Sequence, residues 1–159
     1  MPSIKITTDI GAPIQRVFDL ARSIDLHVDS TVDTYERAIA GVTSGLISLN
    51  QEVTWRAKHF GLWLELTSRI TEFEPPIHFR DSMVKGIFRR FDHDHNFTVE
   101  SGGARMQDTF DFDSPLWFLG RIANALFVTR HLRRLLETRN RAIKEAAETA
   151  KWRSYLKTD

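Results

Sequence analysis

Five ionisable side chains occupy positions where strand alternation predicts the buried face of a sheet. Two of them, His93 and His95, alternate with Phe91 and Phe97 along one stretch. A buried charge is costly unless it is paired or solvated, so such side chains either form hydrogen bonds in the core or line a cavity that holds water or a ligand. We expect a cavity, because a dry core rarely needs so many polar groups. The five residues are His59, Asp81, His93, His95 and Asp108.

Three kinds of chemistry fit this cluster. The first is binding alone, in which imidazole and carboxylate groups orient the polar end of a ligand. The second is general acid–base catalysis by a His–Asp pair, with the imidazole pKa set by the carboxylate. The third is a metal site, which needs histidine nitrogens and a carboxylate to converge. The candidates for a catalytic role are His93, His95, Asp81 and Asp108.

We expect no tightly bound transition metal and no other cofactor. The chain has no cysteine, so thiolate ligands are excluded, and only the two histidines of one strand are well placed for a metal. The sequence contains no nucleophile motif, Gly-rich phosphate loop or dinucleotide-binding fingerprint. For any single histidine the alternative stays open that it pairs with an aspartate only to satisfy the core.

The apolar side chains on the same strand faces predict the kind of ligand. They would supply the free energy of burial, at about 25 cal/mol per Å² of apolar area. The polar side chains would orient the ligand, because an unmatched buried donor or acceptor costs about 1–3 kcal/mol. We therefore expect a mostly apolar ligand with one polar end near His95 and Asp108. The predicted ligand-binding residues are Trp55, His59, Leu64, Leu66, Asp81, Met83, His93, His95, Phe97, Asp108 and Phe110.

The strands that carry these residues lie between Gln51 and Asp113. Each has one apolar and one polar face, which is typical of an antiparallel sheet with one face in water. Upstream, the pattern predicts a strand, two short helices and another strand. Their predicted ranges are Ser3–Thr8, Ala12–Ala21, Ile24–Asp29 and Thr34–Ala40.

The hairpin turns set which of the polar residues meet. Gly102-Gly103 predicts a two-residue turn, which would pair Phe97 with Asp108 and leave His95 on the diagonal. The preceding hairpin would bring Asp81 opposite one of the two histidines, and the sequence does not decide which one. Such neighbours lie about 4.5–8 Å apart, within side-chain reach.

A long helix from Ser114 to about Ala150 must cover the apolar face of this sheet. Ser114 suits the N-cap and Pro115 the first helical position, and the helix would be about 50 Å long. We expect Leu136 to be fully buried by the sheet. The apolar stripe comprises Leu119, Ile122, Leu126, Leu132, Leu136, Ile143, Ala147 and Ala150.

Composition limits the classes of protein that remain. The chain has 159 residues, 42% apolar and 27% charged, as in an ordinary globular domain. It shows no signal-peptide pattern and no apolar run of the roughly 18 residues that a membrane helix needs. Together with the absence of cysteine, this leads us to expect a cytoplasmic protein, as a monomer or homodimer.

The charge distribution bears on possible partners. The net charge of +1 argues against nucleic acid as the main partner. From Arg121 to Lys157, however, ten Lys or Arg residues face only three glutamates. This basic helix is interpreted as a solvated face. Transient contact with a membrane surface, or binding of an acidic partner, stays as an alternative.

Several short motifs accompany this order of elements. Between the first strand and the first helix stands the pattern I-x-A-P-x-x-x-V-F, from Ile10 to Phe18. Later come W-x-A-x-H-F-G, F-x-D-x-M-V-x-G, H-x-H and M-x-D-x-F-x-F, which span Trp55–Gly61, Phe79–Gly86, His93–His95 and Met106–Phe112. The whole chain resembles the START-like (SRPBCC) superfamily, which includes Bet v 1-like proteins, polyketide cyclase/dehydrases and coenzyme Q-binding lipid-transfer proteins.

The resemblance implies a single START-like ligand-binding domain over residues 1–159. Its fold would be the α+β helix-grip fold: a curved antiparallel sheet of seven strands around a long C-terminal helix, with two short helices after the first strand. It further implies a deep cavity for a hydrophobic small molecule such as a lipid, quinone or polyketide. A cyclase or dehydratase enzyme is the alternative that the resemblance leaves open, and it assigns no catalytic residue because activities differ across the superfamily.

Overall fold

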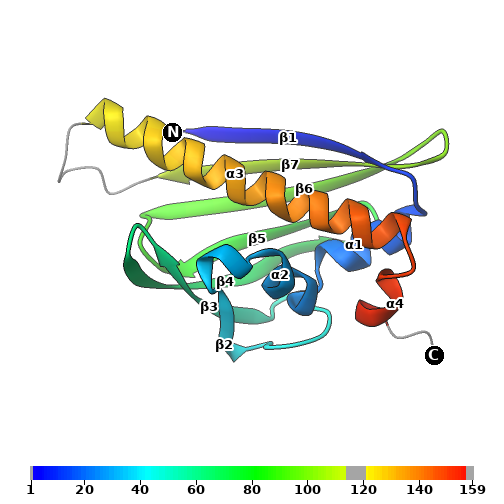
Figure 1. Ribbon diagram of the computed structural model, residues 1–159, viewed down its shortest axis with the longest axis horizontal. Coiled ribbons are helices and arrows are strands. Elements are labelled where there is room, and N and C mark those ends of the chain that lie inside the picture. Colours follow the sequence, from blue (N-terminus) through cyan, green and yellow to red (C-terminus); the bar gives the residue numbers. More distant parts are fainter. Residues whose placement is uncertain (1, 114–120, 157–159) are drawn as a thin grey trace.

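A computed structural model describes residues 2–113 and 121–156 of the chain. Seven antiparallel strands form one sheet in the order β1-β7-β6-β5-β4-β3-β2, and helix α3 lies across its inner face (Figure 1). This confirms the predicted α+β helix-grip fold. The elements are β1 (Ser3–Ile10), α1 (Ile14–Ala21), α2 (Ile24–Ser30), a 3-10 turn (Val32–Thr34), β2 (Arg37–Gly41), β3 (Glu52–His59), β4 (Leu62–Glu74), β5 (His78–Lys85), β6 (Arg90–Glu100), β7 (Gly103–Asp113), α3 (Arg121–Glu148) and α4 (Trp152–Tyr155).

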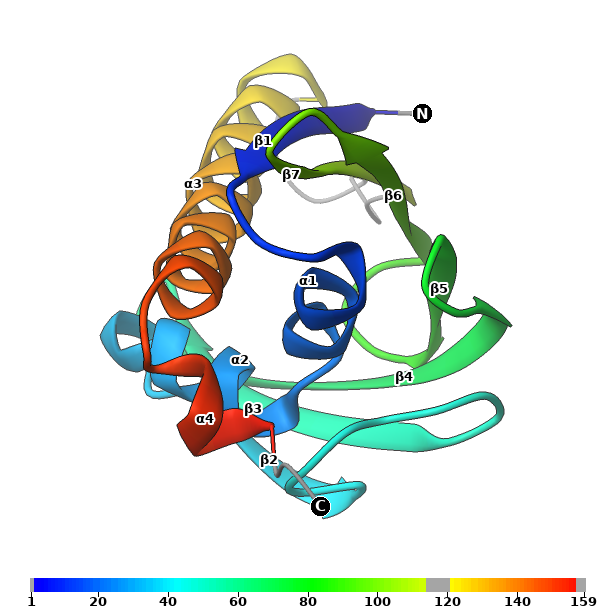
Figure 2. The same ribbon diagram turned by 90° about the vertical axis from the view of Figure 1, so that its right-hand side faces the viewer.

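Helix α1 fills one end of the space that the sheet encloses. The sheet curves around it, and α3 closes the remaining side (Figure 2). Phe18 of α1 is fully buried, and its ring centroid lies 5.6, 5.5 and 5.4 Å from those of Phe73, Phe79 and Phe97. Edge-on and tilted aromatic contacts at these distances add to the free energy of burial. Aromatic side chains therefore fill the space under α1, and room for a ligand is left elsewhere.

The β6–β7 hairpin turns one residue earlier than the sequence suggested. Gly103 already belongs to β7 and pairs with Glu100, so Phe97 faces Met106 and His95 lies directly opposite Asp108. The predicted pairing of Phe97 with Asp108 is therefore wrong. The reason is tertiary: a Cβ atom on Gly103 would come within 2.1 Å of the Ile10 carbonyl oxygen, so this glycine is needed where β1 passes close by.

The β5–β6 hairpin fixes the pairing that the sequence left open, namely which histidine lies opposite Asp81. Asp81 pairs with His93, and Phe79 pairs with His95. Because side chains alternate along a strand, Asp81, His93 and His95 project from the same face of the sheet. The structure therefore brings Asp81 near both histidines.

Helix α3 contacts the sheet along only part of its length. Its C-terminal half is tightly packed, with Ile143, Ala146 and Ala147 at most 2% exposed. The helix packs against β1, α1 and α2, which hold its N-terminal half away from the central strands. Leu136 is consequently half-buried instead of fully buried, and Leu126, in the predicted stripe, is 68% exposed.

Two further points concern this helix. The predicted helix start at Ser114 and Pro115 lies outside the described residues. Among the described helices, none is both long and apolar enough to span a membrane.

Leu136→Ala is expected to cost less stability than a buried position would predict. Its side chain borders a cavity, so its removal enlarges existing space and should lower the free energy of unfolding by only about 1 kcal/mol. Ile143→Ala, about two turns further along and 1% exposed, should cost about 2–5 kcal/mol. Urea denaturation of both variants measures the difference. Equal losses would show that Leu136 packs on the sheet after all.

Candidate functional site

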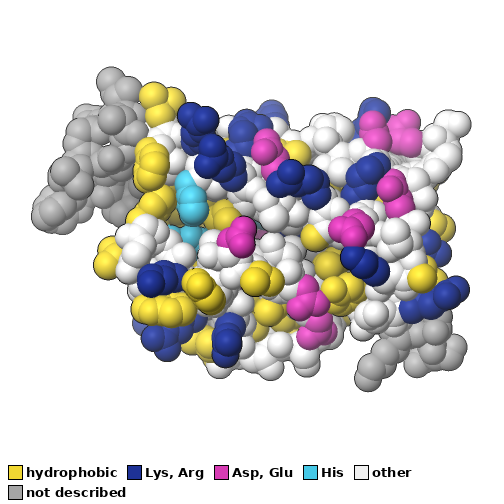
Figure 3. All heavy atoms as spheres, viewed as in Figure 1, with side chains coloured by type: hydrophobic (Ala, Val, Ile, Leu, Met, Phe, Trp, Pro, Cys, Tyr) yellow, Lys and Arg dark blue, Asp and Glu magenta, His cyan; other side chains and the backbone are white. Residues whose placement is uncertain are grey.

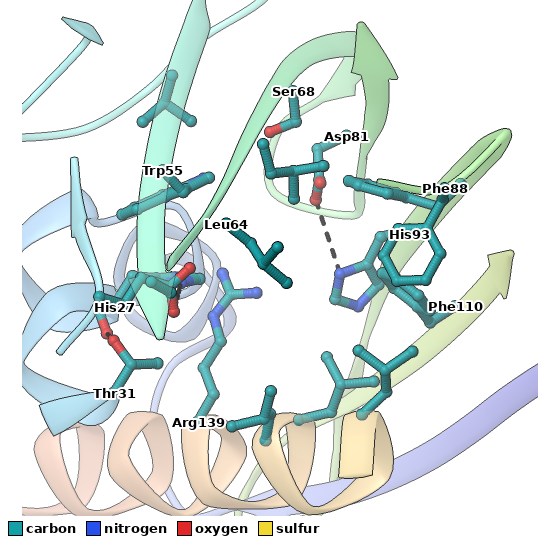
Figure 4. A pocket seen from close by; sticks show the side chains of 18 of the residues that line it. His27, Thr31, Trp55, Leu64, Ser68, Asp81, Phe88, His93, Phe110 and Arg139 are labelled. Carbon is teal, nitrogen blue, oxygen red and sulfur yellow. Dashed lines mark hydrogen bonds and ion pairs between the residues drawn. The ribbon is translucent and has the colours of Figure 1, made fainter. Parts of the chain in front are cut away.

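A cavity of about 390 Å³ lies between α3 and the central strands of the sheet. Its size falls in the range of small-molecule sites, about 300–1,000 Å³, and its lining is mainly apolar. Figure 4 shows side chains from α2, α3 and the sheet converging on it. The apolar lining includes Trp55, Ala57, Leu64, Leu66, Ile70, Phe88, Phe91, Phe110, Val128, Leu132, Leu135 and Leu136.

The sequence-predicted ligand-binding residues separate into two groups. Those that line the cavity are Trp55, His59, Leu64, Leu66, Asp81, His93 and Phe110. Met83, His95, Phe97 and Asp108 lie outside its lining. Phe97 is covered by Phe18 of α1, and His95 and Asp108 are at most 2% exposed. Because α1 fills the concave face over this end of the sheet, the cavity begins at His93.

A buried polar network stands behind the wall formed by Asp81 and His93. Asp108 accepts hydrogen bonds from His93 Nε2 at 3.0 Å and from Asn140 Nδ2 at 2.6 Å. His95 Nδ1 lies 2.8 Å from Asp108 Oδ1, off the line of its N–H bond, so this contact is electrostatic. His95 Nε2 lies 3.3 Å from Asp81 Oδ2. The network thus joins three strands to helix α3.

The pKa values within the network follow from burial and partners. Burial disfavours the charged form of Asp108, but its contacts with His93 and His95 outweigh this effect and hold its pKa well below the ordinary value. Burial lowers the pKa of His93, and the neighbouring charge of His95 lowers it further. Burial also acts on His95, yet Asp108 and Asp81 prevail and raise its pKa. His95 is therefore the more easily protonated of the two histidines, and His93 is the one that favours the neutral form.

Arg139 of α3 lines the cavity, and sequence reasoning missed it. Figure 4 shows its guanidinium reaching into the cavity, between His27 on one side and His93 on the other. One nitrogen donates to the Ala21 carbonyl oxygen. Among the residues that the structure describes, none places a carboxylate oxygen within 4 Å of it. A cation without an ion-pair partner in an apolar cavity favours an anionic ligand group.

A signal for Arg139 was present in the sequence. It stands three residues after Leu136 and four before Ile143, and so lies within the apolar stripe of α3. Asn140, which is 4% exposed and bonds to Asp108, shares this face. Polar residues inside an apolar stripe are the same kind of signal that singled out the strand histidines.

At the α2 end of the cavity, Trp55 and His27 form a stacked pair. Their ring centroids lie 4.1 Å apart at 22°, and Trp55 is 7% exposed. His27 Nε2 lies 3.4 Å from Glu36 Oε2. Burial raises the pKa of Glu36, but the charge and hydrogen bond of His27 outweigh it, so the pKa is lowered. Glu36 thus has its partner in His27, and it lies in no ion pair with Arg139 among the residues that the structure describes.

The β3–β4 turn meets α3 at the other end of the cavity. His59 Nδ1 lies 3.1 Å from His131 Nε2, and the Phe60 ring lies 4.6 Å from His131 and 5.1 Å from Phe127 between centroids. Phe60 and Phe127 are both more than half exposed. Figure 3 shows histidine side chains among hydrophobic ones at the surface near this end of the described α3. His59, Phe60 and His131 line this end of the cavity, its mouth, and Phe127 packs against Phe60 beside it.

Comparison with known proteins identifies the fold. No protein-family model matches the sequence, and a search of curated proteins returns no match. The protein TTHA0849 from Thermus thermophilus superposes with a TM-score of 0.75 at 17% identity, over 92% of this chain and 97% of that chain. The Zhui aromatase/cyclase from Streptomyces gives 0.75 at 14% identity, over 92% and 93%. The major latex-like protein 151 from Panax ginseng gives 0.65 at 12% identity, over 93% and 98%. These similarities confirm the predicted helix-grip fold.

Proposed function

We propose that this helix-grip domain binds, and carries, a hydrophobic small molecule that has one acidic or enolic group. The observation that supports this most directly is the Arg139 guanidinium in an otherwise mainly apolar cavity. A ligand oxygen that carries negative charge would take up its free donors, and apolar contacts would supply the free energy of burial. Long-chain fatty acids and flat polycyclic phenols have this chemistry, whereas a quinone offers only neutral carbonyl oxygens to the same guanidinium. The polar end would lie near Arg139 and His93, further towards α3 than His95 and Asp108.

Trp55 should report ligand binding by a change in its fluorescence. Its indole lines the cavity, so a bound ligand would replace the neighbouring empty space and alter the stacking with His27. Titration with fatty acids, quinones or polycyclic phenols should change the emission, and Trp55→Phe should abolish most of the change. Trp152→Phe is the matched control, because Trp152 contacts Arg16 and does not line the cavity. A response that survives in Trp55→Phe but disappears in Trp152→Phe would place the ligand elsewhere.

The second candidate function is an enzyme of the cyclase or dehydratase kind. The observation that favours it is His93, a neutral imidazole on the cavity wall that is held by Asp108 and lies next to Asp81. A neutral imidazole can accept a proton from a ligand carbon or hydroxyl. The Zhui aromatase/cyclase shares the fold, which supports the same reaction class only by analogy.

Four variants separate the two functions. They are Asp81→Asn, His93→Ala, His95→Ala and Asp108→Asn. For each, binding is followed by Trp55 fluorescence and turnover by loss of a poly-β-carbonyl substrate analogue. Lost turnover with retained binding in His93→Ala would support the enzyme, and lost binding would support the carrier. If the variants lose only their ability to fold, the cluster has a structural role in the core and no role in binding or turnover.

A further inference from the structure

Three metal-ligand atoms converge at the cavity wall. Asp81 Oδ2 lies 3.7 Å from His93 Nδ1 and 3.3 Å from His95 Nε2, and all three atoms lie within 4.8 Å of one another. The register that pairs Asp81 with His93 produces this arrangement. The expectation that no metal binds depended on only two histidines being well placed. Asp81 supplies the third ligand atom.

The distances suit a shared metal ion better than direct hydrogen bonds. Charge-assisted N–H···O bonds are about 2.7–2.9 Å long, and both contacts to Asp81 are longer. Around a transition metal with bonds of about 2.0–2.2 Å, neighbouring ligand atoms lie about 3.0–3.5 Å apart. One ion would come within bonding distance of all three atoms if His93 Nδ1 moved closer to both Asp81 Oδ2, now 3.7 Å away, and His95 Nε2, now within 4.8 Å.

Asp108 holds the outer nitrogen of both imidazoles. Its Oδ1 atom lies 3.0 Å from His93 Nε2 and 2.8 Å from His95 Nδ1, and its other oxygen accepts from Asn140. Metal-bound histidines almost always have such a carboxylate or carbonyl partner on their second nitrogen, which fixes the tautomer and the ring. The His95 ring is also stacked on Phe79 at 4.2 Å. The inner nitrogens are thus oriented before any ion arrives.

The site has room for further ligands on its cavity side only. Asp81 and His93 line the cavity, and 19% of the Asp81 side chain is exposed there, against 1% for His95. Figure 4 shows Asp81 and His93 pointing toward each other across the wall. Two histidines and one carboxylate with open positions are the set found for Fe²⁺ and, with water, for Zn²⁺. The two carboxylates would balance the charge of a divalent ion.

We propose that Asp81 Oδ2, His93 Nδ1 and His95 Nε2 form a binding site for one divalent transition metal ion such as Zn²⁺ or Fe²⁺, with open coordination positions toward the cavity. An oxygen donor such as a phenolate, enolate or carboxylate would fill an open position. That last point rests on the proposed ligand-binding function, but binding of the ion does not.

Metal titration of chelator-treated protein tests the site without any ligand. Calorimetry with Zn²⁺ and the visible absorbance of Co²⁺ should both show one ion per chain. Asp108→Asn should weaken binding about 10- to 100-fold, as expected for an outer partner. Asp81→Asn and His95→Gln, which remove ligand atoms, should weaken it by more than about 100-fold. The melting temperature of each variant shows whether it is folded.

His78→Gln is the matched control. His78 also lies between two carboxylates, Asp94 at 3.1 Å and Glu72 at 3.9 Å, but Arg80 binds both of them and the site has no second histidine. Affinity should be unchanged in this variant. The His131→Gln variant tests whether the metal binds instead at the other close histidine pair, His59 and His131, at the mouth of the cavity.

Two results would overturn the proposal. One is failure of the folded wild-type chain to bind Zn²⁺ or Co²⁺ at 100 times the protein concentration. The other is binding that is unaffected by Asp81→Asn but lost in His78→Gln or His131→Gln. If His95→Gln does not fold, the near-isosteric Asp81→Asn variant and the wild-type Co²⁺ spectrum decide. Failure of the ligand titrations with Trp55 would leave the metal measurement intact.

Discussion

Asp108→Ala is expected to lower the free energy of unfolding by about 3–5 kcal/mol, the usual cost of removing one partner from a buried charged pair. The carboxylate is 2% exposed and joins His93, His95 and Asn140. Its loss leaves the Nε2–H of His93 without an acceptor and the amide of Asn140 with only the longer bond to Thr8 Oγ1 at 3.3 Å. It also removes one of the two carboxylates that raise the pKa of His95. Chemical denaturation at neutral pH measures the change.

Asp111→Ala provides the control on the same strand. Asp111 is only partly buried and projects from the opposite face of β7, where it pairs with Asp92 across the β6–β7 ladder. Removal of one of two facing acidic groups should change stability by less than about 0.5 kcal/mol. If Asp108→Ala costs no more than Asp111→Ala, the network does not stabilise the fold.

The same carboxylate makes stability depend on pH. Because the folded-state pKa of Asp108 lies well below its ordinary value of 3.8, its contribution is present above pH 3.8 and is lost as the pH falls below that value. The pKa of Asp81 is lowered as well, with the same sign. The stability difference between wild type and Asp108→Asn should therefore shrink on acidification below pH 3.8. A difference that grows there would contradict the assignment of Asp108 as the ionised centre of the network.

Arg139→Met is expected to weaken binding of ligands with a carboxylate or phenolate group about 10- to 100-fold, because hydrogen bonds to charged groups contribute about 1.5–3 kcal/mol. Methionine keeps much of the chain length but has no donor. Fluorescence titration through Trp55 gives the dissociation constants. The methyl ester of the same fatty acid is the matched ligand, and its affinity should change less than about threefold, since it offers no charge to Arg139.

Two controls make this result specific. Arg134→Met removes an exposed arginine of the same helix and should leave both ligands unaffected. Arg139 also donates to the Ala21 carbonyl oxygen, so the melting temperature of Arg139→Met must be compared with the wild type. Equal weakening of acid and ester would show that Arg139 acts only through packing, and the proposed acidic ligand group would then have to be given up.

Alternation along the strands allowed the sequence alone to determine which side chains face inward. Val53, Trp55 and Ala57 are buried, and so are His93, His95 and Asp108, as their parity predicted. This works because side-chain direction in a strand is a local property with a period of two. The order of the elements and the short motifs likewise predicted the helix-grip fold before any tertiary contact was known.

Only the tertiary structure decided which inward residues meet and which of them border the cavity. The β6–β7 register depends on the close passage of β1 over Gly103, two segments that are distant in the sequence. Along β6 the cavity ends at His93 because α1 places Phe18 over Phe97. Residues of α3 such as Arg139 and Leu136 face empty space instead of the sheet, because α1 and α2 hold the helix away from it. Periodicity determines the direction in which a side chain points, but what it meets there depends on how distant elements fill a shared volume.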